Sequence, residues 1–157
     1  MMGFGAGANR NTTNFRLESY AATVQQILAS MNVNVQNARL PTEEGYGWSF
    51  REGSAIIEVY IIQQGDTGYL QVLSPIMHIP QSGLLPLYRR LLELNLQLTS
   101  AAFGVFEDVV YVFNERPLDG MDAMEGRSII TLVARYADKH DDELIAEFGG
   151  RSYARAQ

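Results

Sequence analysis

The sequence predicts an α+β fold, a two-layer sandwich in which helices cover one face of a mostly antiparallel, five-stranded sheet. Two observations predict it. Apolar residues recur at helical spacing in three segments, near residues 14–31, 84–96 and 119–148. Between these segments, short runs alternate in polarity and are separated by tight turns, which join antiparallel strands. The predicted order is helix, three strands, helix, two strands, helix (α-β-β-β-α-β-β-α).

The first predicted helix begins near Asn14 and ends at Met31. Thr13 or Asn14 is a suitable N-cap, because a side-chain oxygen there can accept a hydrogen bond from the first turn. The apolar residues at helical spacing are Phe15, Leu17, Tyr20, Ala21, Val24, Ile27, Leu28 and Met31. The preceding residues 1–13 are rich in Gly, Ala and Asn, so we expect a flexible tail there. This segment lacks the charged start and apolar run of a signal peptide.

Three strands are expected next, over residues 46–50, 55–62 and 69–76. In each of them, apolar side chains recur at every second position and therefore point to one face of the sheet. A two-residue turn at Glu52-Gly53 joins the first two strands. Pro75 either ends the regular pairing of the third strand or places that strand at an edge, because proline lacks the N–H that a ladder needs.

The second half of the chain predicts two helices around a hairpin. A leucine-rich helix covers residues 84–96, and its early proline is tolerated in a first turn. Two aromatic strands follow, over residues 102–106 and 109–113. A long helix begins between Asp119 and Asp122, and Gly149-Gly150 ends it.

The composition indicates one globular domain, which we expect over residues 14–150, with a C-terminal tail at 151–157. The net charge of −6 argues against a nucleic-acid-binding surface, which needs clustered Lys and Arg. The chain has no cysteine, which excludes disulfides and thiolate sites. No run approaches the roughly 18 apolar residues of a membrane-spanning helix. We therefore expect a cytoplasmic protein that binds neither nucleic acid nor membrane.

No set of residues predicts catalysis, a metal site or a cofactor. The sequence has no G-x-S-x-G elbow, no H-E-x-x-H motif and no phosphate-binding loop in a strand-loop-helix context. His140 lies on the apolar stripe of the last helix. Its acidic neighbours are Asp138, Asp141, Asp142 and Glu143. Because successive neighbours cannot share one helix face, we interpret His140 as a partly buried helix histidine rather than a metal ligand. Asp119 and Asp122 are interpreted as helix-capping residues.

The most informative feature for function is the second strand, which is apolar on both faces. Its helix-facing set is expected to be Ala55, Ile57, Val59 and Ile61. In a two-layer fold no helix covers the other face, and an exposed apolar patch of this kind usually marks an interface. The alternatives are that Ile62 is buried at a sheet end or that the two faces are inverted. The candidate partner or dimer surface is Ile56, Tyr60, Ile62, Tyr69 and Leu73.

Several segments carry a resemblance to a known family. They are LLELN (91–95), FGVF (103–106), VVYV (109–112), PLDGM (117–121) and DDELIAEFGG (141–150). With the element order, they resemble the YbjN-like family of bacterial sensory transduction regulators, which is similar in fold to the class I type III secretion chaperones. The resemblance covers most of the chain, from about residue 15 to about residue 150. It implies an α-β-β-β-α-β-β-α fold, homodimers and work by protein binding, and it implies no catalytic residue.

The leading hypothesis is a non-enzymatic protein-interaction module, chaperone-like or regulatory, that binds a partner polypeptide and forms a homodimer. The alternative is a small-molecule sensor with a pocket between sheet and helices, lined by Trp48, Tyr46 and His78. An enzyme would require an acid–base pair that converges in the structure, and the sequence offers no such pair.

Overall fold

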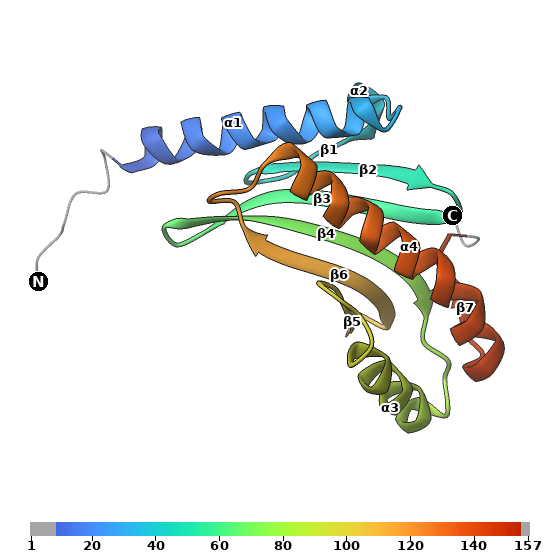
Figure 1. Ribbon diagram of the computed structural model, residues 1–157. Helices are drawn as coiled ribbons and strands as arrows, with labels where there is room; N and C mark the ends of the chain where they lie inside the picture. Colours follow the sequence, from blue (N-terminus) through green and yellow to red (C-terminus); the bar gives the residue numbers. More distant parts are fainter. Residues whose placement is uncertain (1–8, 155–157) are drawn as a thin grey trace, which may run out of the picture.

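The computed structural model describes residues 9–154, with side chains from residue 17 onwards. A single antiparallel sheet has the strand order β1-β2-β3-β4-β6-β5, and β7 pairs with β4 (Figure 1). The strands are β1 (Arg39–Leu40), β2 (Tyr46–Glu52), β3 (Ala55–Gln64), β4 (Thr67–His78), β5 (Ala102–Phe106), β6 (Val109–Pro117) and β7 (Arg151–Ser152). The helices are α1 (Asn9–Ser30), α2 (Val35–Ala38), α3 (Leu84–Asn95) and α4 (Ala123–Phe148).

The predicted fold class is confirmed, and the sheet is larger than predicted, with seven strands in place of five. The additional strands, β1 and β7, have two residues each and are too short to show a period of two. Arg151 and Ser152 pair with His78 and Met77, so part of the predicted C-terminal tail belongs to the sheet. Helix α1 begins at Asn9 rather than near Asn14, because its polar first residues carry no apolar period; residues 1–8 of the predicted tail lie outside the described chain.

The hydrophobic core lies between the sheet and the helices α1 and α4. The predicted helix-facing set of β3, Ala55, Ile57, Val59 and Ile61, is buried, with exposed fractions of 5% or less. Helix α4 contributes Ile129, Ile130, Val133, Ala134, Ala137 and Leu144 to this core. At Gly126 a Cβ would lie 2.8 Å from Ile27 Cδ1, so glycine lets α1 approach α4 closely. The two helices thus cover one face of the sheet together.

Helix α4 begins as the sequence predicts. The Asp122 side chain accepts a hydrogen bond from the Glu125 N–H at 2.8 Å, which makes Asp122 the N-cap. The last turn ends where the Gly149 N–H donates to Ile145 O at 2.9 Å. Asp119 lies in the link before the cap and is not itself the N-cap.

Pro75 interrupts β4 on one side only. Pairing of β3 with β4 ends at Glu58 and Leu73, two residues before the proline, as one of the two sequence expectations has it. The Ser74 hydroxyl donates instead to Ile56 O at 2.7 Å. On the other side β4 continues beside β6 to His78, with a register shift after Pro75. The strand therefore stays inside the sheet, because the bulge and the serine accommodate the missing N–H.

Candidate functional site

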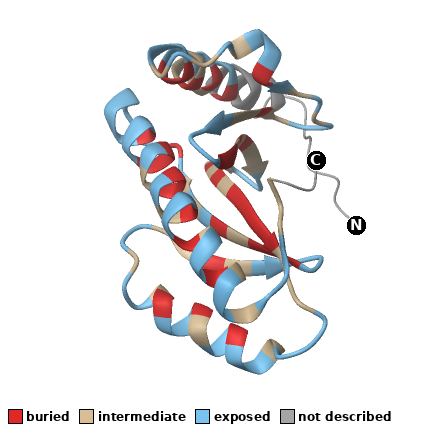
Figure 2. Ribbon diagram, turned by 90° about the vertical axis from the view of Figure 1, so that its right-hand side faces the viewer, coloured by how far each residue is buried: buried red, intermediate tan, exposed pale blue. Residues whose placement is uncertain are grey.

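The sheet face opposite α1 and α4 carries a set of apolar side chains, here called the open face. Strand alternation and register place these residues on it: Tyr60 and Ile62 from β3, Tyr69 and Leu73 from β4, Tyr111 and Phe113 from β6, and Gly104 and Phe106 from β5. Figure 2 shows α4 along one side of the sheet, while the opposite side carries none of the described helices. The faces are therefore oriented as the sequence analysis expects.

Four of the five residues predicted for this surface are partly exposed on the open face. Tyr60, Ile62, Tyr69 and Leu73 are half-buried, and Ile62 lies directly opposite Tyr69 in the β3–β4 ladder. Ile56 points to the same face but is only 6% exposed. Its contribution to an accessible surface is therefore smaller than the sequence predicts.

The C-terminal segment accounts for the burial of Ile56. It returns over this end of the open face, where Tyr153 stacks on His78 with ring centroids 5.4 Å apart. The Tyr153 N–H donates to Ile76 O at 3.1 Å. Arg51, which is opposite Ile56 on β2, donates through Nη2 to Ala154 O at 3.3 Å. This cover comes from residues about a hundred positions away, so the local strand pattern could not predict it.

A shallow depression of about 330 Å³ lies on the open face between Tyr60 and Leu73 on one side and the β5–β6 hairpin on the other. Phe106 is 67% exposed at its rim. Gly104 lies under the Phe113 ring, and a Cβ there would be 3.3 Å from Phe113 Cε1. The hairpin half of this surface is absent from the predicted set. The hairpin strands are apolar on both faces, as β3 is, and this pattern could have predicted the hairpin half of the surface.

The polar groups in the depression are few. The Tyr60 hydroxyl donates to Glu58 Oε2 at 3.0 Å. Burial and the Glu58 carboxylate raise the pKa of Tyr60, and burial together with Tyr153 raises the pKa of Tyr111. Both phenols therefore keep their protons at neutral pH, and the Tyr60 hydroxyl acts as a hydrogen-bond donor. The depression combines an aromatic lining with one carboxylate and holds no nucleophile–base pair.

The pocket predicted for a small-molecule sensor does not form. Tyr46 and Trp48 stack with ring centroids 6.3 Å apart on the helix-facing side, and the Arg39 guanidinium lies over both rings. Trp48 is fully buried. His78 lies on the opposite face, against Tyr153. The prediction failed because these residues come from opposite faces of the sheet.

His140 is a core histidine, as the sequence analysis favours. It is 5% exposed, with Nδ1 3.2 Å from Glu143 Oε2 and its ring edge-on to Phe103 at 5.5 Å. Burial lowers its pKa, while Glu143 acts in the opposite direction. Among the described residues, no group of His, Asp and Glu side chains could hold a metal ion.

A second apolar surface lies on α3 and was missed by the sequence analysis. Leu85, Tyr88 and Leu92 of α3 and its C-cap residue Leu96 occur at helical spacing on one exposed face, called the α3 stripe, with exposed fractions of 80%, 37%, 68% and 89%. The other face of α3 packs into the core through Leu87, Leu91 and Leu94. The sequence signal for this surface was the number of leucines in the α3 segment, which is larger than one buried helix face can hold.

The described part of the chain contains no helix that is both long and apolar enough to cross a bilayer.

Comparison with solved structures shows the fold at low sequence identity. The chain aligns with one in the HopA1–SchA chaperone–effector complex at 8% identity, with a TM-score of 0.59 over 82% of this chain and 97% of that chain. A chain of the ExsC–ExsE complex aligns at 16% identity, with a TM-score of 0.54 over 78% and 94% of the two chains. YbjN from E. coli aligns at 12% identity, with a TM-score of 0.50 over 78% and 91%.

The family follows from the sequence match. No curated protein has significant sequence similarity to the chain. A family model described as T3SS (YopN, CesT) and YbjN peptide-binding chaperone 1 matches residues 18–156, which is most of the sequence. The resemblance to YbjN-like proteins is thereby confirmed. The chain belongs to the family of type III secretion and YbjN peptide-binding chaperones.

Proposed function

We propose that this chain is a non-enzymatic, chaperone-like protein that binds a segment of a partner polypeptide on the open face and acts as a homodimer. The observation that carries the proposal is the exposed aromatic and aliphatic depression on a sheet face that none of the described helices covers, in a member of a peptide-binding family. Exposed apolar surface of this kind usually marks an interaction site.

The depression suits an apolar side chain of an extended segment. Phe106, Val105 and Phe113 are 67%, 40% and 38% exposed, so a partner side chain could bury a large apolar area against them. Strand β5 ends the sheet beside this depression. Asn95 occupies the main-chain groups of Phe103, and the part of the β5 edge after Phe103 can pair with the main chain of an extended polypeptide. Main-chain pairing would supply affinity, and the depression would select the side chain.

The α3 stripe is the proposed dimer surface. Three leucines and a tyrosine on one helix face are costly to leave in water, and two copies can cover them by packing stripe against stripe about a two-fold axis. This assignment leaves the open face for the partner. The proposal also places the chain in the cytoplasm and excludes nucleic acid and membrane as partners, in keeping with its net charge of −6.

The proposal is tested by adding charge to the open face. Tyr60→Glu with Leu73→Glu puts two carboxylates beside Glu58 in the depression, and we expect this double variant to stay dimeric by light scattering. When the immobilised variant is incubated with lysate of the source organism, it should fail to capture polypeptides that the immobilised parent captures. Gln26→Glu with Ala29→Glu adds the same charge on exposed positions of α1 and should retain them. Equal retention by both double variants would remove the open face from the proposal.

A further inference from the structure

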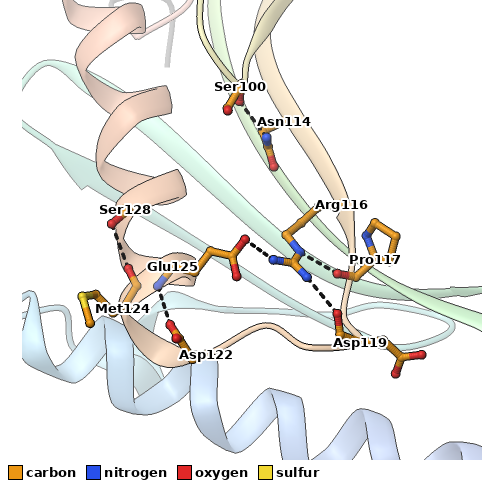
Figure 3. Close-up of polar contacts among 9 residues, drawn as sticks. All are labelled: Ser100, Asn114, Arg116, Pro117, Asp119, Asp122, Met124, Glu125 and Ser128. Atoms are coloured by element: carbon orange, nitrogen blue, oxygen red, sulfur yellow. Dashed lines mark hydrogen bonds and ion pairs between the residues drawn. The ribbon is translucent and has the colours of Figure 1, made fainter.

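A groove of about 670 Å³ lies on the helix side of the sheet, between α4 and β6, away from the open face. One wall is an exposed stripe of α4 formed by Met124, Ser128, Thr131 and Arg135, and the other is formed by Asn114 and Arg116 of β6. Figure 3 shows the Arg116 side chain reaching towards Glu125 in the first turn of α4, while the Asn114 side chain bonds to Ser100. The alternate residues of β6 that face the helices are first the buried Val110 and Val112 and then these two polar residues. The polar change opens the groove.

One guanidinium in the groove is fixed by the protein itself. Arg116 donates through Nε to Pro117 O at 2.6 Å and through Nη2 to Asp119 O at 2.9 Å, and it forms an ion pair with Glu125 (Figure 3). Its charge is therefore balanced. It serves as a structural support for the wall rather than as a free cation.

Two further arginines line the groove without an acidic partner among the described residues. Arg127 and Arg135 are exposed on α4, and the polar contact of Arg127 is to the Ser30 hydroxyl at 3.3 Å. The whole chain carries a net charge of −6, so a groove with two unbalanced positive charges stands out from its surroundings. Such a site attracts carboxylates, because arginine presents donors in a geometry that matches them.

Two features of β6 favour a polypeptide in this groove. Asn114 Oδ1 is buried and has no hydrogen-bond donor among the described residues, while the Asn114 amide donates to Ser100 O at 2.7 Å. A main-chain N–H of a bound segment would satisfy that oxygen once the Asn114 side chain turns it towards the groove. The pairing of β5 with β6 ends at Phe113, so β6 has no β5 partner over residues 114–116; the next residue, Pro117, lacks an N–H, and its carbonyl accepts from Arg116. An extended segment can lie along this part of the β6 edge.

We propose that this groove binds an acidic, extended stretch of the partner polypeptide, with Arg127 and Arg135 each holding one carboxylate. The proposal rests on the proposed function and adds a second contact to it. The two arginines are eight positions apart on α4, a rise of about 12 Å. Four residues of an extended chain span about 13 Å. The geometry therefore selects acidic residues four positions apart, a requirement that would contribute to partner choice.

The test uses a labelled peptide with the sequence Thr-Glu-Val-Thr-Val-Glu-Thr, followed by fluorescence anisotropy with the full chain. Arg127→Gln with Arg135→Gln should weaken binding by roughly tenfold, the equivalent of two modest charge-assisted contacts. Arg89→Gln with Lys139→Gln removes the same charge from exposed positions elsewhere and should leave binding unchanged. The peptide with Gln in place of both Glu residues should bind as weakly to the parent as the acidic peptide binds to the groove variant.

The outcomes separate this proposal from the proposed function. Tyr60→Glu with Leu73→Glu should bind the acidic peptide like the parent, because the open face lies on the other side of the sheet. Equal weakening by the groove and control variants would overturn the groove as the site. Displacement of the peptide by inorganic phosphate at equal concentration would overturn the acidic-peptide assignment. Circular dichroism and thermal unfolding of each variant show that the fold is kept.

Discussion

The charge state of His140 is set by its burial in the core. Burial lowers its pKa below the ordinary 6.5, although Glu143 raises it in part. The unfolded chain therefore takes up a proton near pH 6.5, whereas the folded chain takes it up only at lower pH. Stability that is present above pH 6.5 is consequently lost as the pH falls towards the folded pKa.

Replacing this histidine should remove that part of the pH dependence. We expect the free energy of unfolding of the parent to fall relative to that of His140→Gln as the pH falls from about 7.5 to about 5.5. An advantage of the parent over the variant at the higher pH should therefore narrow. Urea unfolding at several pH values measures it. A gap that stays constant or widens would show that the folded-state pKa of His140 is not lowered.

The Ser74 hydroxyl is a second single-residue contribution to stability. It is fully buried and donates to Ile56 O beside Pro75, where the ladder between β3 and β4 ends. Ser74→Ala should lower the free energy of unfolding by about 1 kcal/mol, because a buried carbonyl loses its donor. Ser128→Ala removes an exposed hydroxyl that bonds within α4 and should change it by less than about 0.5 kcal/mol. Equal effects in chemical denaturation would contradict the role of Ser74.

At the scale of elements, one side chain joins α3 to β5. Asn95 donates through Nδ2 to Phe103 O at 3.2 Å, and its Oδ1 accepts from the Phe103 N–H at 2.6 Å. Asn95→Ala should lower the free energy of unfolding by about 1–2 kcal/mol. Asn95→Asp keeps the acceptor and should lose less, and the exposed Gln97→Ala should be close to neutral. Thermal unfolding that ranks these variants otherwise would show that this link contributes little.

The elements that the sequence predicted are those long enough to show a period. Helix α4 and strands β2 to β6 show such a period. The apolar second face of β3 led to Tyr60 and Leu73, and the strand register puts both on the open face; their part in binding stays a prediction. The remainder depends on partners distant in sequence. The burial of Ile56 needs the C-terminal segment, and the two-residue strands β1 and β7 exist only through pairing. Local sequence patterns cannot predict such long-range contacts.

At the scale of the whole molecule, the proposed homodimer depends on the α3 stripe. Leu92→Glu with Leu96→Glu places charge at its most exposed half, so two copies could no longer pack without burying carboxylates. The variant should scatter light as a 17.5 kDa monomer, and the parent as a species of twice that mass. Gln26→Glu with Ala29→Glu should remain dimeric. A parent that is monomeric at every concentration would contradict the dimer.

The central claim is that the open face holds a partner polypeptide, and site-specific photo-crosslinking tests it most directly. A benzophenone side chain replaces Phe113 in one variant and the exposed Gln26 in another, and each is irradiated in lysate of the source organism. The account predicts polypeptide adducts from position 113 that disappear when Tyr60→Glu and Leu73→Glu are added, with none from position 26. Adducts of equal yield from both positions, or adducts from position 113 that survive the two glutamates, would contradict it.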